Sequence, residues 1–319
     1  MEIPTIYLMA ITYASELTLL SIGFTLTYLT AKIPNFAHGT YAGIGIYVAY
    51  TFAKFWHISP YYGYPVAFIL GGLVSVIVYK VVIGTLSKMG SGSIVLTIAT
   101  LAIQIFLGAL VNIYAYSFVA FYGQYASGFL LREWDFEFLG IAGIFWVAIG
   151  LSVVIVLILH YLLTKTKLGI SMRATAEDTE LASVLGINIQ NVQIFSWFLT
   201  GGLACLAGAM IPMWFMSSPT TGSAIITSIM AGSLLGGFDS VYGAIIGGFT
   251  IGFSEIMFTL WGQQLLGPWF GEYRPLIPMI FLITILLIEP RGLQGFYERI
   301  KSRRSTTTAM KVKKEETDK

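Results

Sequence analysis

The stretch MGSGSIVLTIATLAIQIFLGALVNIYAYSFVAFYGQYASGFLL, residues 89–131, contains no aspartate, glutamate, lysine or arginine. A second charge-free stretch covers residues 181–238. A helix that crosses about 30 Å of hydrocarbon needs about 20 mostly apolar residues, so both stretches are long enough to cross. Charged residues make up only 11% of the chain, whereas a soluble domain carries about 25%. The sequence therefore predicts a polytopic integral membrane protein.

Apolar segments of similar length recur on both sides of these stretches. They predict an all-α transmembrane helical bundle of about 8–10 spans, of which we place nine. The seventh is short and is interrupted by Gly236 and Gly237, which favours a half-helix or a re-entrant element. The nine predicted spans lie near residues 5–31, 38–56, 64–87, 92–116, 139–163, 191–214, 223–237, 240–262 and 275–289.

The basic residues predict the orientation of these spans. Cytoplasmic loops carry an excess of lysine and arginine, and nine of the eighteen basic residues follow Glu289. If the C-terminal end lies in the cytoplasm, nine spans place the N-terminus outside. Only Lys54, Arg132 and Arg274 then lie outside. The basic residues expected inside, besides those nine, are Lys32, Lys80, Lys88, Lys165, Lys167 and Arg173.

Two regions are expected in a protein of the cell membrane. Residues 1–296 form one transmembrane domain, with a polar cytoplasmic loop at 164–190. Residues 297–319 form a basic cytoplasmic tail that is nearly free of large apolar residues and is therefore expected to be disordered. A basic tail at a membrane edge is attracted to anionic lipid, so we expect lipid, and not nucleic acid, as its partner.

Composition alone argues against a disulfide, a metal site and a nucleotide-binding site in this chain. One cysteine, Cys205, forms no intrachain disulfide, and three histidines with one cysteine show no metal-ligand spacing. The sequence contains no G-x-x-x-x-G-K-[ST] phosphate loop, and no polar region is large enough for a nucleotide-binding domain. Any ATP-driven mechanism would need a separate chain.

The segment TKTKLGISMRATAEDTELASVLGINIQNVQ, residues 164–193, is the most polar internal stretch. Thr175 and Asp178 have a spacing like that of a capping box, and acidic groups suit the N-terminus of a helix. Gly186 is a suitable residue just beyond a C-terminus. We therefore predict one helix of about ten residues, roughly 176–185.

The predicted helix 176–185 has one apolar face, formed by Leu181, Val184 and Leu185. Such a helix could rest on lipid headgroups. However, the carboxylates of Glu177 and Asp178, with a further one at position 180, would be repelled by an anionic inner leaflet. A protein partner on the cytoplasmic side fits these residues better.

Four collinear motifs resemble the branched-chain amino acid ABC transporter permeases. The first is GISMRATAEDTELASVLGINIQNVQIFSWFLTGGLACLAGAM, residues 169–210. NFAHG at 35–39 is similar to the element after the first span of the shorter, H-type subunit. GGFDSVYGAIIGG at 236–248 resembles a glycine-rich loop and span, with Asp239 where the family usually has a small residue. PRGL at 290–293 resembles the element after the last span.

The resemblance implies a subunit of an importer. In that family two permease subunits, usually a heterodimer, sit on two ATPase subunits, and an extracytoplasmic binding protein delivers the amino acid. ATP and magnesium would be bound by the partner ATPase, with no cofactor in this chain. The loop helix would dock in a groove of the ATPase. The resemblance assigns this coupling role to Arg173, Ala174, Glu177, Asp178, Leu181, Ala182, Val184, Leu185 and Gly186.

Four residues of the spans are candidates for the translocation pathway. Glu16 and Glu255 are the carboxylates set deepest in apolar segments, and a buried charge usually faces a cavity or a partner. Each could hold the ammonium group of an amino acid or bond a neighbouring helix. Asn35 and His38 could form a gate, or Asn35 could cap the second helix while His38 bonds a carbonyl.

Two other functions are compatible with the residues. A permease of the same type could carry another small solute, such as a sugar or an amide. A stand-alone secondary transporter would need clustered ionisable residues in mid-membrane or an inverted repeat. The sequence has two isolated glutamates and no clear repeat, and this third function would leave the 164–193 loop without a role.

Overall fold

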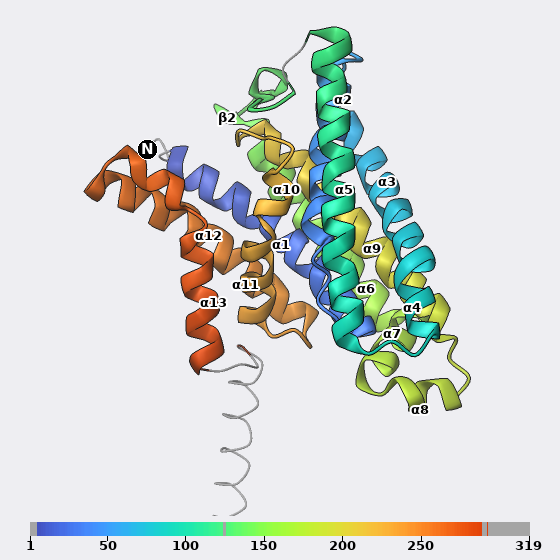
Figure 1. Cartoon of the computed structure of the whole chain (residues 1–319). Helices are drawn as coiled ribbons and strands as arrows, with labels where there is room; N and C mark the ends of the chain where they lie inside the picture. The colour runs from blue at the N-terminus through green and yellow to red at the C-terminus, as the bar shows by residue number, and fades with distance from the viewer. Residues whose placement is uncertain (1–4, 124–125, 289–291, 293–319) are drawn as a thin grey trace, which may run out of the picture.

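The computed structural model describes residues 5–123, 126–288 and 292, and helices make up most of them (Figure 1). The α-helices are α1 (Thr5–Ala31), α2 (His38–Lys54), α3 (Gly63–Val78), α4 (Gly84–Lys88), α5 (Ser93–Tyr122), α6 (Gly143–Lys165), α7 (Lys167–Glu177), α8 (Thr179–Val184), α9 (Ile189–Met210), α10 (Thr221–Ala224), α11 (Ile226–Gly236), α12 (Val241–Leu266) and α13 (Leu276–Ile288).

Short turns and one small ribbon complete the fold. The helical turns are η1 (Pro60–Tyr62), the π-helical η2 (Tyr79–Ile83), η3 (Arg132–Trp134), η4 (Ile211–Met213) and η5 (Pro268–Tyr273). The strands β1 (Glu137–Phe138) and β2 (Ile141–Ala142) pair antiparallel, with Glu137 opposite Ala142.

The all-α polytopic class is confirmed. Six helical segments of the described chain are long and apolar enough to cross a membrane, namely Thr5–Ala31, Pro60–Lys88, Ser93–Tyr122, Gly143–Lys165, Ile189–Met213 and Val241–Leu266. The other three predicted spans are helical but shorter: α2, the α10–α11 pair and α13. Length and composition thus support six crossings and leave the count of nine a prediction.

Some predicted boundaries were wrong, for local reasons. The span expected from residue 139 begins at Gly143, because the preceding residues form the β1–β2 ribbon. The span expected to end near residue 116 continues to Tyr122, where Gly123 takes a positive φ of 63° and ends the helix. The short seventh segment contains α10 and α11, and α11 ends at Gly236, where the interruption was expected. Whether it is a half-helix or a re-entrant element stays a prediction. The predicted tail, 297–319, lies outside the described residues.

Helices α1 and α9 form the centre of the bundle. Helix α1 packs against α12, α9, α6 and α11, and α9 also packs against α2 and α3. Hydroxyl groups join the two central helices: Thr27 donates to the Thr200 hydroxyl at 2.8 Å, and Ser196 donates to the Leu26 carbonyl at 2.9 Å. These bonds satisfy polar groups that lipid could not satisfy.

Close helix crossings explain part of the high glycine content. At Gly45 of α2, an added Cβ would overlap the Cys205 carbonyl of α9 and lie 2.8 Å from the Cys205 Cα. Since backbone atoms cannot move aside as a flexible side chain can, only glycine fits at this crossing. Small residues are the usual means of bringing membrane helices together.

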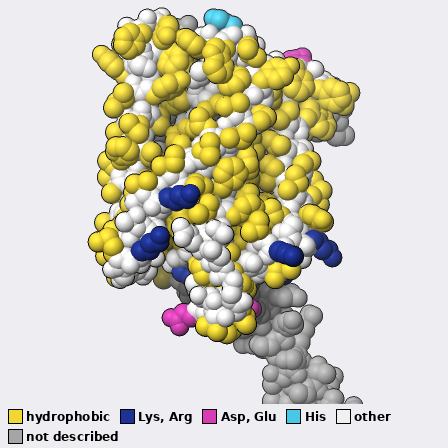
Figure 2. All heavy atoms as spheres, turned by 90° about the vertical axis from the view of Figure 1, so that its right-hand side faces the viewer, with side chains coloured by type: hydrophobic (Ala, Val, Ile, Leu, Met, Phe, Trp, Pro, Cys, Tyr) yellow, Lys and Arg dark blue, Asp and Glu magenta, His cyan; other side chains and the backbone are white. Residues whose placement is uncertain are grey.

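The bundle has two chemically different ends. Figure 1 places the start of α1 and the β1–β2 ribbon at one end, and α7 and α8 at the other. On the face drawn in Figure 2, lysine and arginine side chains gather toward the lower end, whereas the upper part is almost wholly apolar. This asymmetry of basic residues is the one from which the orientation was predicted.

Candidate functional site

Helices α7 and α8 project from the lower end of the bundle (Figure 1). Helix α7 starts where the Thr166 hydroxyl accepts a hydrogen bond from the Gly169 N–H at 3.1 Å. Its inward side holds Met172 and Thr175, which are buried, and it packs against α6, α9 and α1. This packing fixes the base from which α8 extends.

The prediction of one helix at 176–185 was wrong in its start. The chain instead forms α7 and then α8, with a break at Asp178, whose φ of −151° is extended. Thr175 is not a cap, because it lies inside α7 and its hydroxyl donates to the Ser171 carbonyl. The Asp178 carboxylate caps α8 by accepting from the N–H groups of Glu180 and Leu181, both at 2.9 Å.

The predicted end of this helix is confirmed. Gly186 has a φ of +84°. Its N–H donates to the Ser183 carbonyl, and the N–H of Ile187 donates to the Ala182 carbonyl at 3.1 Å. This pair of bonds is the Schellman arrangement, which requires a left-handed residue and therefore favours glycine.

The apolar face of α8 has no cover within the described chain. Leu181, Val184 and Leu185 are 56%, 84% and 71% exposed, respectively. Ala182 points the other way and is buried. Glu177 and Asp178 are exposed beside this face. The three apolar residues thus form an exposed apolar surface on a short helix, and the acidic residues lie at its edge. We call this apolar surface the α8 face (Leu181, Val184 and Leu185).

The polar residues of α7 meet the ends of two other helices. Arg173, Ala174 and Glu177 line a cavity of about 770 Å³. At its rim Lys32, at the end of α1, forms an ion pair of 3.1 Å with Asp239, before α12. Sequence reasoning missed Lys32 and Asp239 as site residues, although Asp239 had been singled out by its departure from the family pattern.

Glu255, on α12, belongs to a charged cluster. Its Oε1 lies 2.6 Å from Nε of Arg274, and the Tyr13 hydroxyl donates to the same carboxylate at 3.3 Å. The Arg274 guanidinium stacks on the rings of Tyr13 and Phe215, with its carbon 4.3 and 5.4 Å from their centroids. The charge of Glu255 is therefore neutralised within the chain.

Glu16, on α1, differs from Glu255. Its side chain is completely buried, and neither carboxylate oxygen has a hydrogen-bond partner in the part of the chain that the structure describes. The hydroxyl of Tyr64, which is near enough for an electrostatic interaction, is also buried without a partner there. The structure does not bring Glu16 and Glu255 into direct contact.

Asn35 and His38 lie at the junction of α1 and α2, and both are buried. His38 Nε2 lies 2.9 Å from the Leu20 carbonyl. A hydrogen bond to a carbonyl was one of the two roles predicted for this histidine. The predicted cap was wrong: Ala37 occupies the N-cap position of α2, and no side chain caps it. The Asn35 side chain lies near Tyr41.

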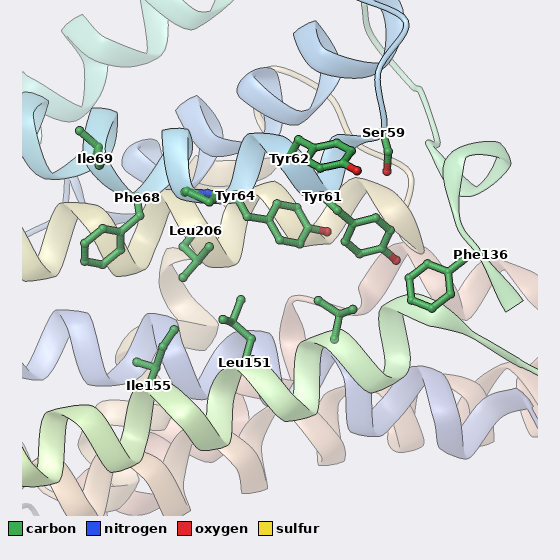
Figure 3. Close-up of a pocket in the computed structure, with 12 residues that line it drawn as sticks. Ser59, Tyr61, Tyr62, Tyr64, Phe68, Ile69, Phe136, Leu151, Ile155 and Leu206 are labelled. Carbon is green, nitrogen blue, oxygen red and sulfur yellow. The ribbon is translucent and has the colours of Figure 1, made fainter. Parts of the chain in front are cut away.

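A second cavity, of about 830 Å³, lies between the η1–α3 segment and α6. Figure 3 shows Tyr61 and Tyr64 on one side, with Leu151 and Ile155 of α6 facing them. Tyr61 donates to Asp135 at 2.5 Å and so closes the polar end of the cavity. The remaining lining is aromatic and aliphatic, which suits an apolar group and gives no charged partner for an amino acid.

An apolar helical bundle with six helical segments able to cross a membrane, within the described residues, is the fold of a multi-pass membrane protein. The chain belongs to the family described as branched-chain amino acid transport system / permease component, whose model matches residues 6–287. This membership makes it a multi-pass transport protein of the cell membrane in a family of ABC-type permeases, which are not themselves enzymes.

Named relatives cover nearly the whole chain. It is 38% identical to the probable branched-chain amino acid transport permease protein LivH of Methanocaldococcus jannaschii, over 93% of this chain and 95% of the relative. It is 26% identical to the high-affinity branched-chain amino acid transport permease LivH of Escherichia coli K12, over 89% and 93%. PsaBC from Streptococcus pneumoniae shares the fold, with a TM-score of 0.51 and 14% identity over 92% and 94% of the two chains.

Proposed function

We propose that this chain is the membrane-spanning subunit of an ATP-driven importer that admits branched-chain or similar amino acids. An extracytoplasmic binding protein delivers the solute, two ATPase subunits bind ATP and magnesium, and a second permease, the same or different, completes the membrane part. Family membership and the names of the relatives support the solute class.

The uncovered α8 face is the observation that carries the proposal. Three large aliphatic side chains exposed together on a helix mark an interaction site, and the acidic residues beside them disfavour an anionic lipid surface. An ATPase groove would bury Leu181, Val184 and Leu185, with Glu177 and Asp178 at the rim. Ala182 would act indirectly by packing α8 against the bundle. Gly186 would act indirectly by ending α8.

The position of α7 explains how ATP could move the bundle. Helix α7 is joined to α8 by the single extended residue Asp178, and its residues Arg173, Ala174 and Glu177 line the inner cavity beside Lys32 and Asp239. When ATP closes the ATPase pair, a displacement of α8 would be transmitted through α7 to the inner ends of α1 and α12. Such rigid-body coupling would switch the permease between outward- and inward-facing states.

The proposal also includes the predicted orientation, with nine spans, the N-terminus outside and the C-terminus in the cytoplasm. The basic residues in and beside α7, Lys165, Lys167 and Arg173, support it. Contact of Glu16, Asn35, His38 or Glu255 with the passing solute stays a prediction. All four are buried, so a direct contact would require neighbouring helices to separate during transport.

Another small solute, such as a sugar or an amide, is the second candidate, because binding proteins largely set specificity in this design. A stand-alone transporter is disfavoured by the docking helix. Uptake of leucine, isoleucine and valine into vesicles, with the binding protein and with or without ATP inside, separates these functions. Uptake that continues without ATP would overturn the importer.

The docking role is tested by replacing Leu181, Val184 and Leu185 with serine. We expect the variant to insert and fold, because these side chains are exposed, but to lose the ATPase during affinity purification. Ser183→Ala, on the same short helix, leaves the α8 face unchanged and should keep the ATPase. Recovery of the ATPase at equal yield from both variants would contradict the assignment.

A further inference from the structure

The inner cavity beside α7 has an apolar floor. Its volume is about 770 Å³, which is typical of pockets that bind small molecules. Buried aliphatic side chains from four helices line it and belong to one hydrophobic cluster: Leu26 of α1, Leu163 of α6, Met172 of α7 and Val241 of α12. Such a floor suits a small aliphatic group, because contact with it removes apolar surface from water.

The neutral polar groups of the lining already bond within the chain. The hydroxyls of Thr30 and Thr164 donate to backbone carbonyls of their own helices, at 3.1 and 2.7 Å. The Ser240 hydroxyl accepts from the Gly243 N–H, and the Tyr242 hydroxyl lies 2.7 Å from His160 Nδ1. The charged side chains of the rim are therefore the groups with most capacity left for a ligand.

The rim carries charges of both signs. Lys32, Arg173, Glu177 and Asp239 all line the cavity and are exposed. Lys32 and Asp239 pair with each other, although an exposed pair contributes little and is readily exchanged. Arg173 and Glu177 form neither an ion pair nor a side-chain hydrogen bond within the described residues. One cation and one anion of the rim are thus free.

The charge balance indicates which ligand fits. The formal charges of the four rim residues sum to zero. An anion such as a nucleotide would meet the carboxylates of Glu177 and Asp239, and a cation would meet Lys32 and Arg173. A zwitterion presents one charge to each kind of group.

The spacing of the two free residues matches an α-amino acid. Arg173 and Glu177 are four residues apart on α7 and are therefore neighbours on its surface. An α-amino acid carries its carboxylate and its ammonium group on the same carbon, so both groups can reach this pair. A guanidinium binds a carboxylate through two parallel hydrogen bonds.

We propose that the inner cavity binds a cytoplasmic amino acid with an aliphatic side chain, and that the bound amino acid slows the transport cycle. Arg173 holds the carboxylate, Glu177 holds the ammonium group, and the side chain lies on the apolar floor. This inference rests on the proposed function, because the proposed orientation places the cavity on the side where imported amino acid accumulates.

The bound amino acid joins α7 to its neighbours. Its charged groups are held by α7, whereas its side chain contacts Leu26 of α1 and Val241 of α12. It therefore stabilises the arrangement in which these helices enclose the cavity and opposes the displacement of α7 that ATP would drive. Binding is expected to be weak, because all the charged partners are exposed to water.

Direct binding is tested on the complete transporter in lipid nanodiscs, without the binding protein. Saturation-transfer NMR detects contact of the valine methyl groups with the protein. We expect a valine signal that Arg173→Gln removes. Ala176→Phe, which fills the cavity from α7, should remove it as well. Isobutylamine, which lacks the carboxylate, and isovalerate, which lacks the ammonium group, should not compete.

Lys167→Gln is the matched control. Lys167 is an exposed cation at the start of the same helix, and it does not line the cavity, so this variant should bind valine like the unaltered protein. Equal signals from Arg173→Gln and Lys167→Gln would overturn the site. A signal that is present in detergent and lost in phosphatidylethanolamine nanodiscs would assign the cavity to a lipid headgroup and would also overturn it.

The effect on transport is tested in vesicles that contain ATP inside and receive the binding protein and labelled leucine outside. We expect valine inside to slow both leucine uptake and ATP hydrolysis about fivefold or more, as allosteric couplings commonly do. Isovalerate inside should have no such effect. Arg173→Gln should lose most of the inhibition, relative to its own rates without internal valine, and Lys167→Gln should keep it.

The outcomes separate this inference from the proposed function. ATP-driven uptake that internal valine leaves unchanged, or that it slows equally in Arg173→Gln and Lys167→Gln, would overturn the feedback site alone. Uptake that does not depend on ATP in any of these vesicles would overturn the proposed function.

Discussion

Two glutamates buried in the same bundle have opposite surroundings. Glu255 is paired with Arg274, and the pair is held by Tyr13 and by stacking on Phe215. Glu16 has no hydrogen-bond partner among the described residues. Removing one member of a buried pair leaves an uncompensated charge, whereas Glu16 forms no ion pair within the described residues that its removal could break.

We therefore expect Glu255→Gln to destabilise the protein and Glu16→Gln not to. Loss of one partner of a fully buried pair costs about 3–5 kcal/mol. Because Arg274 is 26% exposed, we expect about 2–3 kcal/mol for Glu255→Gln. Thermal unfolding in detergent measures both variants, and Glu255→Gln with Arg274→Gln should recover part of the loss.

The same two variants test the predicted contact with the solute. If Glu16 binds the ammonium group of an amino acid, Glu16→Gln should raise the KM for uptake without lowering the unfolding temperature. A lower unfolding temperature for Glu16→Gln than for Glu255→Gln would contradict the pairing described above. An unchanged KM would remove Glu16 from the pathway.

At the scale of helices, glycine decides how closely α2 and α9 approach. We expect Gly45→Ala to destabilise the bundle by about 1–3 kcal/mol or more, because the added methyl group meets the Cys205 backbone and overpacking has this cost. Gly150→Ala on α6 is the control, since a Cβ there meets nothing within 4 Å. Equal unfolding temperatures for both variants would contradict the close crossing.

The short helix α8 is held in place by local bonds and one buried side chain. It has six residues, and isolated helices of this length are unstable in water. The Asp178 cap, the turn at Gly186 and the buried Ala182 fix it instead. The chain can therefore present three apolar side chains in one geometry before any partner binds.

At the scale of the whole molecule, the proposed orientation rests on the distribution of basic residues and has a direct test. We expect a cysteine at Ser127, which is exposed in the segment after α5, to react with a membrane-impermeant maleimide added outside. A cysteine at Thr306, beyond the described residues, should react only after the membrane is opened. The reverse pattern, or labelling of both from one side, would overturn the nine-span orientation.

Composition and local pattern determined much of this protein. Charge-free stretches determined that the chain crosses a membrane, since lipid accepts only helices with satisfied backbone groups or closed barrels. The family motifs determined the transport class. The apolar triplet Leu181, Val184 and Leu185 was predicted to share one face of a helix, because spacing along one helix needs no tertiary information, and the structure leaves all three side chains exposed.

Only the tertiary structure decided which polar residues are satisfied. Glu16 and Glu255 are both set in apolar segments, but Glu255 forms an ion pair with Arg274 and accepts a hydrogen bond from Tyr13 of α1, whereas Glu16 has no hydrogen-bond partner among the described residues. The Lys32–Asp239 pair likewise joins residues far apart in the chain. Local pattern thus determined the helices and the class, while long-range contacts decided where charge and hydrogen-bonding capacity remain free.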